Sequence, residues 1–293
     1  MATTKLDTLQ VTDSRALSYA ITSNSSSSGK RPYVLLSNSL CAPFTVWDHV
    51  VPRLTALGFN ILRYDQPGHG ESGVPKDLSS TTFDSMAEDV HTLLKHLGIE
   101  KLHAWIGVSM GAAAGIVFAA KYPGVVGKLI ACDTISSSPV NAGAADAFTP
   151  RVAAAREAGN MDATIEGTLE RWLGRSWMEK NPEETERMRK LMHGTSIDGF
   201  ETCCAALKSE TFDLRRVTTK AGSGVDAALL LVGENDANLP ESMEELRHDI
   251  ENGLKSKQGD AASVALKVIE NAGHVCFIDG FDSFMEHVTK FLI

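Results

Sequence analysis

Short, almost continuous apolar runs alternate along the chain with longer segments in which apolar residues recur every three to four positions. The continuous runs are typical of strands buried on both faces of a parallel sheet, and the longer spacing is typical of helices. The alternation predicts an α/β protein with a mostly parallel, eight-stranded sheet covered by helices on both faces. Two N-terminal strands are expected within 7–22, and six more at 32–37, 59–64, 103–108, 129–132, 227–232 and 265–269.

Helices are expected where the three-to-four spacing holds and a helix-ending glycine often follows. The segments are 44–57, 82–97, 110–121, about 240–255 and 280–292. The serine-rich stretch at 23–29 is predicted to be a loop tip.

The strand–helix rhythm stops between about 135 and 215. This stretch is rich in Ala, Glu and Arg, has helical spacing and contains no apolar strand run. It predicts a helical insertion rather than a second independent domain. We therefore expect a core at 1–135 and 215–293, and a helical cap at 136–214.

The sharpest motif is Gly107-Val108-Ser109-Met110-Gly111, which lies between a predicted strand and a predicted helix. In that context Gly-x-Ser-x-Gly is a nucleophile elbow. The turn forces the serine into a strained backbone, and side chains at the flanking glycines would collide with neighbouring elements. The motif predicts that Ser109 is a nucleophile at a helix N-terminus, where developing negative charge is favoured.

A serine hydroxyl needs a general base, and the base needs an acid that orients it. For an elbow of this type, the acid follows the serine in the chain and the histidine comes last. His274 is the only histidine downstream of both Ser109 and Asp236 that falls in a strand-to-helix loop, because His248 and His287 fall in predicted helices.

Three carboxylates compete for the orienting role. Asp236 is preferred because it follows the strand at 227–232 and precedes the proline that starts the next helix. Glu234 lies in the same loop, and Asp133 ends the strand at 129–132. Both stay open as alternatives.

An oxyanion hole needs two aligned backbone N–H donors. Met110 directly follows the nucleophile, and Leu40 lies in the loop after the strand at 32–37. We predict that these two amides form the hole.

The run from Gly68 to Gly73 matches Gly-x-Gly-x-x-Gly after a strand, but no helix starts within it. A dinucleotide site would need that helix. A tight structural loop is therefore the preferred interpretation.

Composition limits the partners. Net charge is −9, with 28 Lys and Arg against 37 Asp and Glu, which disfavours nucleic acid and anionic membranes. The cysteine count is odd, with five, and no Cys-x-x-Cys occurs, so neither a disulfide framework nor a thiolate metal site is indicated. No apolar signal segment or membrane span is visible, and we expect a cytoplasmic protein. A homodimer stays open.

With these residues in place, the sequence resembles the α/β-hydrolase superfamily and, more closely, the 3-oxoadipate enol-lactonases. The matching segments extend through most of the chain. They are VLLSNSL, RYDQPGHGES, GVSMG, KYPGVVGKLIACDT, LERWLGRSW, CCAALKSETFDLR, GENDANLP and NAGH. The resemblance implies a helical cap over the active site and hydrolysis of a lactone or ester through an acyl-enzyme, without a metal or other cofactor.

Two departures from those lactonases concern the substrate. Lactonases of that family act on a substrate with a free carboxylate, and an arginine is expected soon after the strand at 129–132. Here no Lys or Arg follows until Arg151, and Cys41 replaces the glycine of the oxyanion loop. Both changes predict a pocket for a less anionic substrate. Trp47, Phe148, Trp172 and Trp177 are candidates to line it, together with Cys41.

The sequence thus predicts hydrolysis of a small ester or lactone by Ser109, His274 and Asp236. Two other hypotheses stay open. One is a biosynthetic enzyme that uses the same groups for cyclisation, elimination or carbon–carbon cleavage. The other is a ligand receptor with slow turnover.

Overall fold

The computed structural model describes residues 2–24 and 31–293, and its described strands form one mixed sheet. The strand order is β1-β2-β4-β3-β5-β6-β7-β8. The first two strands pair antiparallel with each other, β2 is antiparallel to β4, and the remaining pairs are parallel. The strands are β1 (Ala2–Thr12), β2 (Arg15–Asn24), β3 (Tyr33–Ser37), β4 (Asn60–Tyr64), β5 (Leu102–Val108), β6 (Val126–Cys132), β7 (Ala227–Gly233) and β8 (Ala265–Ile269).

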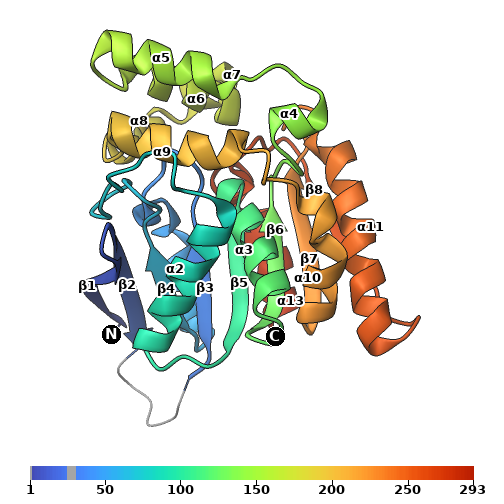
Figure 1. Ribbon diagram of the computed structural model, residues 1–293. Coiled ribbons are helices and arrows are strands. Elements are labelled where there is room, and N and C mark those ends of the chain that lie inside the picture. Colours follow the sequence, from blue (N-terminus) through green and yellow to red (C-terminus); the bar gives the residue numbers. More distant parts are fainter. Residues whose placement is uncertain (1, 25–30) are drawn as a thin grey trace.

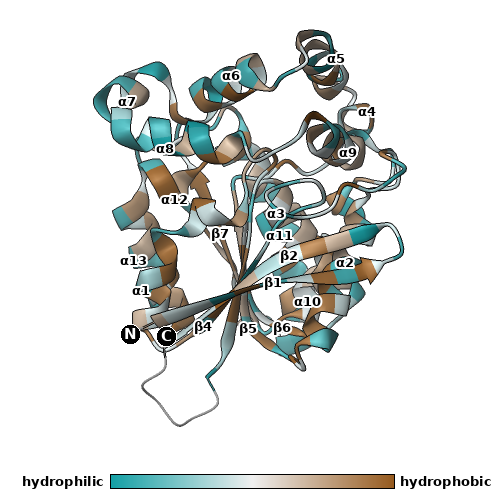
Figure 2. Cartoon of the chain, turned by 90° about the vertical axis from the view of Figure 1, so that its left-hand side faces the viewer, coloured by the Kyte–Doolittle hydropathy of each residue, from teal (hydrophilic) through white to brown (hydrophobic). Residues whose placement is uncertain are grey.

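Helices cover both faces of this sheet (Figure 2). One face carries α1 and α13, and the other carries α2, α3 and α10 (Figures 1 and 2). The predicted α/β class and the mostly parallel eight-stranded sheet are confirmed. The core helices are η1 (Phe44–Trp47), α1 (Val50–Ala56), α2 (Phe83–His96), α3 (Met110–Lys121), η2 (Leu214–Arg216), α10 (Thr218–Gly224), α11 (Leu239–Gln258), α12 (Cys276–Asp279) and α13 (Phe281–Leu292).

A helical cap lies between β6 and β7 in the sequence and above the carboxyl ends of the strands in space (Figure 1). Helices thus occupy the stretch at 136–214 for which a helical cap is expected. Its helices are α4 (Pro139–Ala142), α5 (Phe148–Ala158), α6 (Asp162–Leu173), α7 (Arg175–Lys180), α8 (Pro182–Met192) and α9 (Ile197–Lys208).

One predicted helix is wrong in detail. The segment 44–57 is not continuous but divides into η1 and α1. Pro52 has no N–H to donate to the preceding turn, and a proline is tolerated only in the first turn of a helix. The α-helix accordingly begins at Val50, just before it. Of the predicted loop at 23–29, Ser23 and Asn24 end β2, and the rest lies outside the described residues.

Buried small residues let α3 approach the sheet closely. A Cβ at Gly115 would collide with the indole of Trp105 on β5, so only glycine fits there. Almost the whole of α3 is buried, between the sheet and its neighbouring helices. This helix therefore fixes the position of the residue that precedes it, Ser109.

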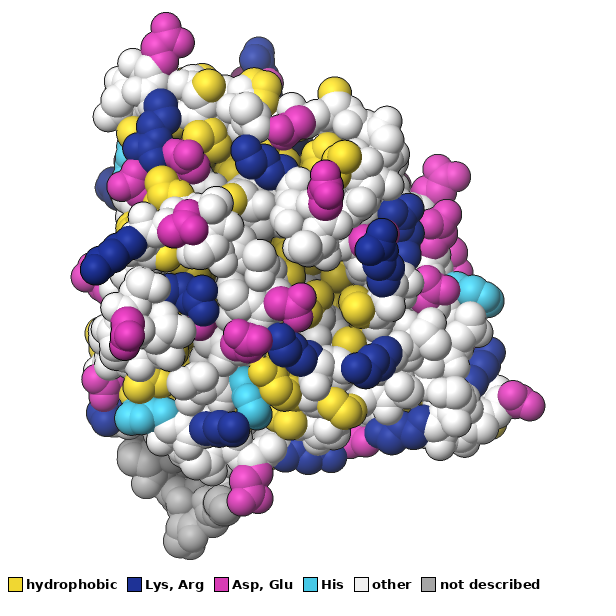
Figure 3. Space-filling model, in the orientation of Figure 1, with side chains coloured by type: hydrophobic (Ala, Val, Ile, Leu, Met, Phe, Trp, Pro, Cys, Tyr) yellow, Lys and Arg dark blue, Asp and Glu magenta, His cyan; other side chains and the backbone are white. Residues whose placement is uncertain are grey.

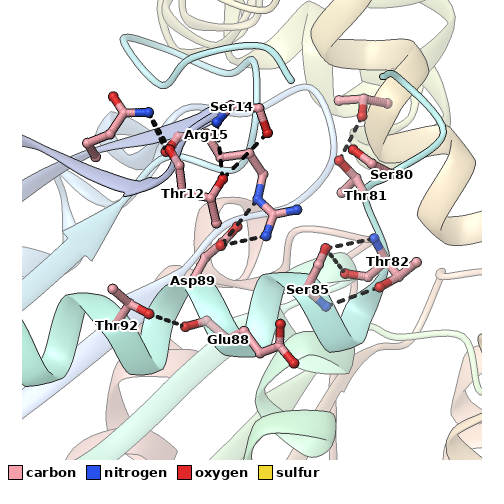
Figure 4. A network of polar contacts seen from close by, with 12 residues as sticks. Thr12, Ser14, Arg15, Ser80, Thr81, Thr82, Ser85, Glu88, Asp89 and Thr92 are labelled. Carbon is pink, nitrogen blue, oxygen red and sulfur yellow. Dashed lines mark hydrogen bonds and ion pairs between the residues drawn. The ribbon is translucent and has the colours of Figure 1, made fainter. Parts of the chain in front are cut away.

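Polar contacts fasten α2 to its neighbours (Figure 4). The Arg15 guanidinium, at the start of β2, donates to Asp89 of α2 at 2.9 Å. Thr82 and Ser85 form a capping box at the start of that helix. The neighbouring Thr81 hydroxyl lies 2.7 Å from that of Thr202 on the cap helix α9. These contacts join the N-terminal strands, the core and the cap.

Charged side chains of both signs share the surface. On the face shown in Figure 3, lysine and arginine side chains lie among acidic ones. Among the described residues, no helix is long and apolar enough to cross a membrane.

Candidate active site

Ser109 lies at the turn between β5 and α3, in a backbone conformation rare for a residue with a side chain. Its φ is 54° and its ψ is −120°. A Cβ at Gly107 would collide with the carbonyl of Gly111, and one at Gly111 would collide with the carbonyl of Ser37. Both glycines are thus required for the turn, which leaves Ser109 half-buried beneath the cap. This is the geometry that the Gly-x-Ser-x-Gly motif predicts.

His274 follows β8 and is buried. Its ring Nδ1 lies 2.7 Å from Oδ2 of Asp236, which is buried in the loop after β7. A carboxylate at this place fixes the Nδ1–H tautomer and leaves Nε2 free to accept a proton. Burial lowers the pKa of His274, and the hydrogen bond to Asp236 opposes that shift.

The two alternative acids contact other groups. Glu234 is exposed and accepts from the backbone N–H of Asn271 at 2.8 Å. Asp133 is fully buried and accepts from the backbone N–H groups of Gly233 at 2.8 Å and Cys276 at 3.3 Å. Burial raises the pKa of Asp133 well above its usual range, and the nearby Asp236 charge adds to that shift. The geometry therefore favours Asp236 as the partner of the histidine.

The backbone of His274 is tied to the cap. Its N–H donates to the carbonyl of Trp172 on α6 at 2.9 Å, and the two rings lie 5.7 Å apart. A Cβ at Gly273 would collide with that same carbonyl, so only glycine permits the contact. The histidine is thus held from below by the acid loop and from above by the cap.

Ser109 and His274 line the same cavity. Within the described part of the chain, no hydrogen bond joins their side chains. In ligand-free sites such bonds are often long and shorten only when substrate is present. The arrangement is therefore compatible with proton transfer from the serine to the histidine.

Two backbone N–H groups are available beside Ser109. Neither Leu40 nor Met110 donates its N–H to an acceptor among the described residues. The next amide, that of Cys41, is occupied, because it donates to Nε2 of His69 at 2.9 Å. Cys41 has a φ of 67°, the left-handed conformation in which a glycine is favoured. This strained turn therefore leaves the Leu40 amide as a free donor of the loop.

His69 holds that turn in place, a role that sequence reasoning missed. Its Nδ1 lies 3.1 Å from the carbonyl of Pro67, and its Nε2 accepts from Cys41, so the ring is neutral. Burial lowers its pKa to about 4, which keeps it neutral at ordinary pH. The Gly-x-Gly-x-x-Gly run around it is a tight loop, as expected. The glycine motif was visible in the sequence, but the contact between His69 and the oxyanion loop was not.

The cavity has a volume of about 570 Å³, a size that suits a small organic ligand. Three of the five residues expected to line it do so: Cys41, Phe148 and Trp172. Trp47 is instead buried in the core and stacks on Phe277, with ring centroids 4.0 Å apart. Trp177 packs half-buried against the core from α7 and is not part of the lining.

Two cap arginines also line the cavity, Arg151 from α5 and Arg171 from α6. The lack of a cation soon after β6, on which the prediction of a less anionic substrate rested, does not mean that the cavity has no cation, and the substrate class stays a prediction. The cations are supplied by helices that lie later in the sequence and fold back over the site. Sequence distance from β6 could not reveal this, because it depends on how the cap docks.

No group of three or more His, Cys, Asp or Glu that could hold a metal ion occurs among the described residues. The five cysteines are free and buried.

The chain is similar to known proteins over most of its length. A family model described as "alpha/beta hydrolase fold" matches residues 32–281. The chain is 29% identical over 177 residues to 3-oxoadipate enol-lactonase 2 of Acinetobacter baylyi, a match that covers 60% of this chain and 63% of that protein. The solved enol-lactonase from Burkholderia xenovorans is 28% identical, with a TM-score of 0.79 over 95% of this chain and 96% of its own. An esterase from Thermogutta terrifontis, 23% identical, shares the fold with a TM-score of 0.80 over 98% of both chains.

Proposed function

Because this chain belongs to the α/β-hydrolase fold family, we propose that it is a serine hydrolase that cleaves an ester or lactone of a small organic molecule. The observation that carries the proposal is the 2.7 Å contact between His274 and Asp236, at a cavity that also exposes the strained Ser109. The similarity to two enol-lactonases supports the same class of reaction.

In the first half of the proposed reaction, Oγ of Ser109 attacks the substrate carbonyl while Nε2 of His274 takes its proton. Asp236 stabilises the imidazolium that forms. The N–H groups of Leu40 and Met110 donate to the oxyanion of the tetrahedral intermediate. His274 then gives the proton to the leaving alkoxide, and an acyl-enzyme remains. In a lactone the alcohol stays attached to the acyl group.

In the second half, His274 takes a proton from water, whose oxygen attacks the acyl carbonyl. The second tetrahedral intermediate collapses, the proton returns to Oγ of Ser109, and the carboxylic acid leaves. The half-buried position of Ser109 beneath the cap keeps the acyl-enzyme out of bulk water. Every step uses groups of this chain, the substrate and one water.

The test is Ser109→Ala, assayed with 4-nitrophenyl esters of short acids and with simple lactones. We expect kcat to fall by at least roughly 1,000-fold, because alanine lacks the hydroxyl that forms the proposed acyl-enzyme. A fluorophosphonate should label the wild-type protein at Ser109 and leave the variant unlabelled. Hydrolysis that survives the substitution would disprove the nucleophile. Turnover without labelling would favour a non-hydrolytic reaction at this site.

A further inference from the structure

Two buried donor groups at the cavity have no hydrogen-bond partner in the part of the chain that the structure describes. They are the hydroxyl of Ser39 and the indole N–H of Trp172, and both residues line the cavity. A buried polar group without a partner costs free energy, because it has given up its hydrogen bonds to water. Such groups are rare in folded proteins, and a catalytic role is one reason for keeping them.

Ser39 lies in the loop that carries the Leu40 amide, beside the nucleophile turn. A Cβ at Gly111, two residues after Ser109, would lie 2.8 Å from the carbonyl oxygen of Asn38. The residue that follows this carbonyl is Ser39, which is 2% exposed. Ser39 thus belongs to the same short stretch of backbone as the Leu40 donor, and this stretch adjoins the turn that provides the Met110 donor.

Hydrogen bonds hold the backbone around Ser39. Its carbonyl accepts from the N–H of Ala42 at 3.3 Å, and the side chain of Asn38 donates to the carbonyl of Ala42. Two residues further along, the Cys41 N–H donates to Nε2 of His69 at 2.9 Å. The position of Ser39 is therefore fixed by its loop, whereas its hydroxyl hydrogen can turn toward an acceptor.

The two unpartnered donors lie on opposite walls of the cavity. Trp172 comes from the cap, and its ring lies beside that of His274. Ser39 comes from the core loop whose next amide is proposed to bind the carbonyl oxygen. Negative charge develops on that oxygen only as Ser109 attacks. A hydrogen bond to a charged acceptor is stronger than one to a neutral acceptor, so a donor placed there acts mainly on the transition state.

We propose that the Ser39 hydroxyl is a third donor of the oxyanion hole and binds the oxygen of the tetrahedral intermediate together with the N–H groups of Leu40 and Met110. This inference rests on the proposed function, since it adds a catalytic residue to the same reaction. The hydroxyl donates a hydrogen bond and keeps its proton, so the proton transfers by His274 are unchanged. The cost of burying the hydroxyl is offset when the charged oxygen forms.

The test is Ser39→Ala, assayed with 4-nitrophenyl pentanoate. We expect kcat to fall by roughly 100-fold with little change in KM, a loss typical of one oxyanion donor. Both half-reactions pass through an oxyanion, so the loss should appear whichever of them limits the rate. Ser138→Ala is the matched control and should keep both constants. The Ser138 hydroxyl, at the start of α4, is also buried without a partner among the described residues, but Ser138 does not line the cavity.

Two further measurements separate a catalytic hydroxyl from a structural one. Alanine removes an unpartnered polar group, so both variants should unfold at a urea concentration equal to or above that of the wild type. Phenylboronic acid forms a tetrahedral adduct with an active-site serine and so resembles the intermediate. It should inhibit Ser39→Ala at least roughly tenfold more weakly than the wild type, and Ser138→Ala as strongly as the wild type.

The outcomes distinguish this inference from the proposed function. An active wild-type enzyme with an equal kcat in Ser39→Ala overturns the third donor and leaves the hydrolase intact. A loss confined to KM does the same, because it places the hydroxyl on the bound substrate rather than on the oxyanion. A fall in kcat together with a lower urea midpoint also overturns it, in favour of a structural role. If the wild type hydrolyses no ester or lactone, the proposed function fails, and the third donor fails with it.

Discussion

The two walls of the cavity are built in different ways. The core wall presents backbone geometry: the strained turn at Ser109, the free amides of Leu40 and Met110, and a histidine loop packed against Asp236. The cap wall presents side chains from two helices, among them the guanidinium groups of Arg151 and Arg171. The core thus supplies the groups that are suited to breaking a bond, and the cap supplies positively charged side chains.

The two walls should therefore differ in how they respond to amino-acid substitution. Glycines of the core wall admit no Cβ because backbone atoms lie against them, so small changes there should disturb the whole site. Helix side chains of the cap can be exchanged without moving the sheet. Substrate choice can therefore change in the cap while the chemistry of the core stays the same.

The largest expected effect is a loss of kcat caused by a substitution in the core wall. Asp236→Asn should lower kcat by about 1,000- to 10,000-fold, because an amide no longer stabilises the imidazolium or fixes the required tautomer. The loss should be equal for mono-4-nitrophenyl glutarate and 4-nitrophenyl pentanoate, since both need the same proton transfer. Steady-state kinetics with both esters measure it.

Glu234→Gln, in the same loop but exposed, is the matched control and should change kcat less than about twofold. If Asp133→Asn causes the larger loss, Asp133 is the orienting acid and the assignment of Asp236 is wrong. A loss confined to the glutarate ester would also contradict the separation of the two walls.

A pair of glycine substitutions compares the rigidity of the walls. Gly111→Ala places a Cβ against the Ser37 carbonyl and should lower the free energy of unfolding by about 1–3 kcal/mol. Gly167→Ala, on the cavity side of α6, meets no atom within 4 Å and should raise it by about 0.5–1 kcal/mol, because alanine favours a helix interior. Urea unfolding followed by circular dichroism measures both. Equal effects in the two variants would contradict the proposed difference in rigidity.

The smallest expected effect is a shift of the pH profile. His274 must be neutral to accept the serine proton, and burial lowers its pKa from 6.5. Activity should therefore persist as the pH falls through 6.5 and decline only below it. The measurement is kcat/KM for the uncharged pentanoate ester between pH 4.5 and 8 at constant ionic strength.

Asp279 provides the control for that profile. It accepts from the backbone N–H of Gly273 at 2.6 Å, and burial raises its pKa to about 7. Asp279→Asn keeps an acceptor oxygen but cannot titrate, and Asp133→Asn removes the other buried carboxyl with a raised pKa, so a decline that survives both substitutions is assigned to His274. A wild-type decline centred at or above pH 6.5 that also survives both would contradict the expected shift.

The features that were most predictable from the sequence are those set by residues close together in the chain. The strand–helix rhythm predicted the sheet and the cap insertion, because periodicity records which face of an element is buried. The elbow at Ser109 was predictable because the Gly-x-Ser-x-Gly motif itself signals the turn, although one of its glycines is required by the neighbouring strand β3. The helix expected at 44–57 failed because Pro52 interrupts the hydrogen bonds that the apolar spacing suggested.

Contacts between segments that lie far apart in the chain were harder to predict from the sequence. Three acids were compatible with the histidine, and the fold brings Asp236 to it because two loops at the sheet edge meet there. His69 was visible only as part of a glycine-rich loop. The aromatic residues divided according to the docking of each helix, which placed Trp172 at the cavity and Trp47 in the core.

The sequence by itself determined the class of fold and the position of the strained serine, because both depend on short-range sterics and on the pattern of burial. Only the tertiary structure decided the electrostatic character of the pocket. A net charge of −9 and the lack of an early arginine pointed away from an anionic ligand. The cap nevertheless brings two guanidinium groups to one cavity, neither of them in an ion pair within the described residues, since a local field depends on which charges lie close together and not on their sum.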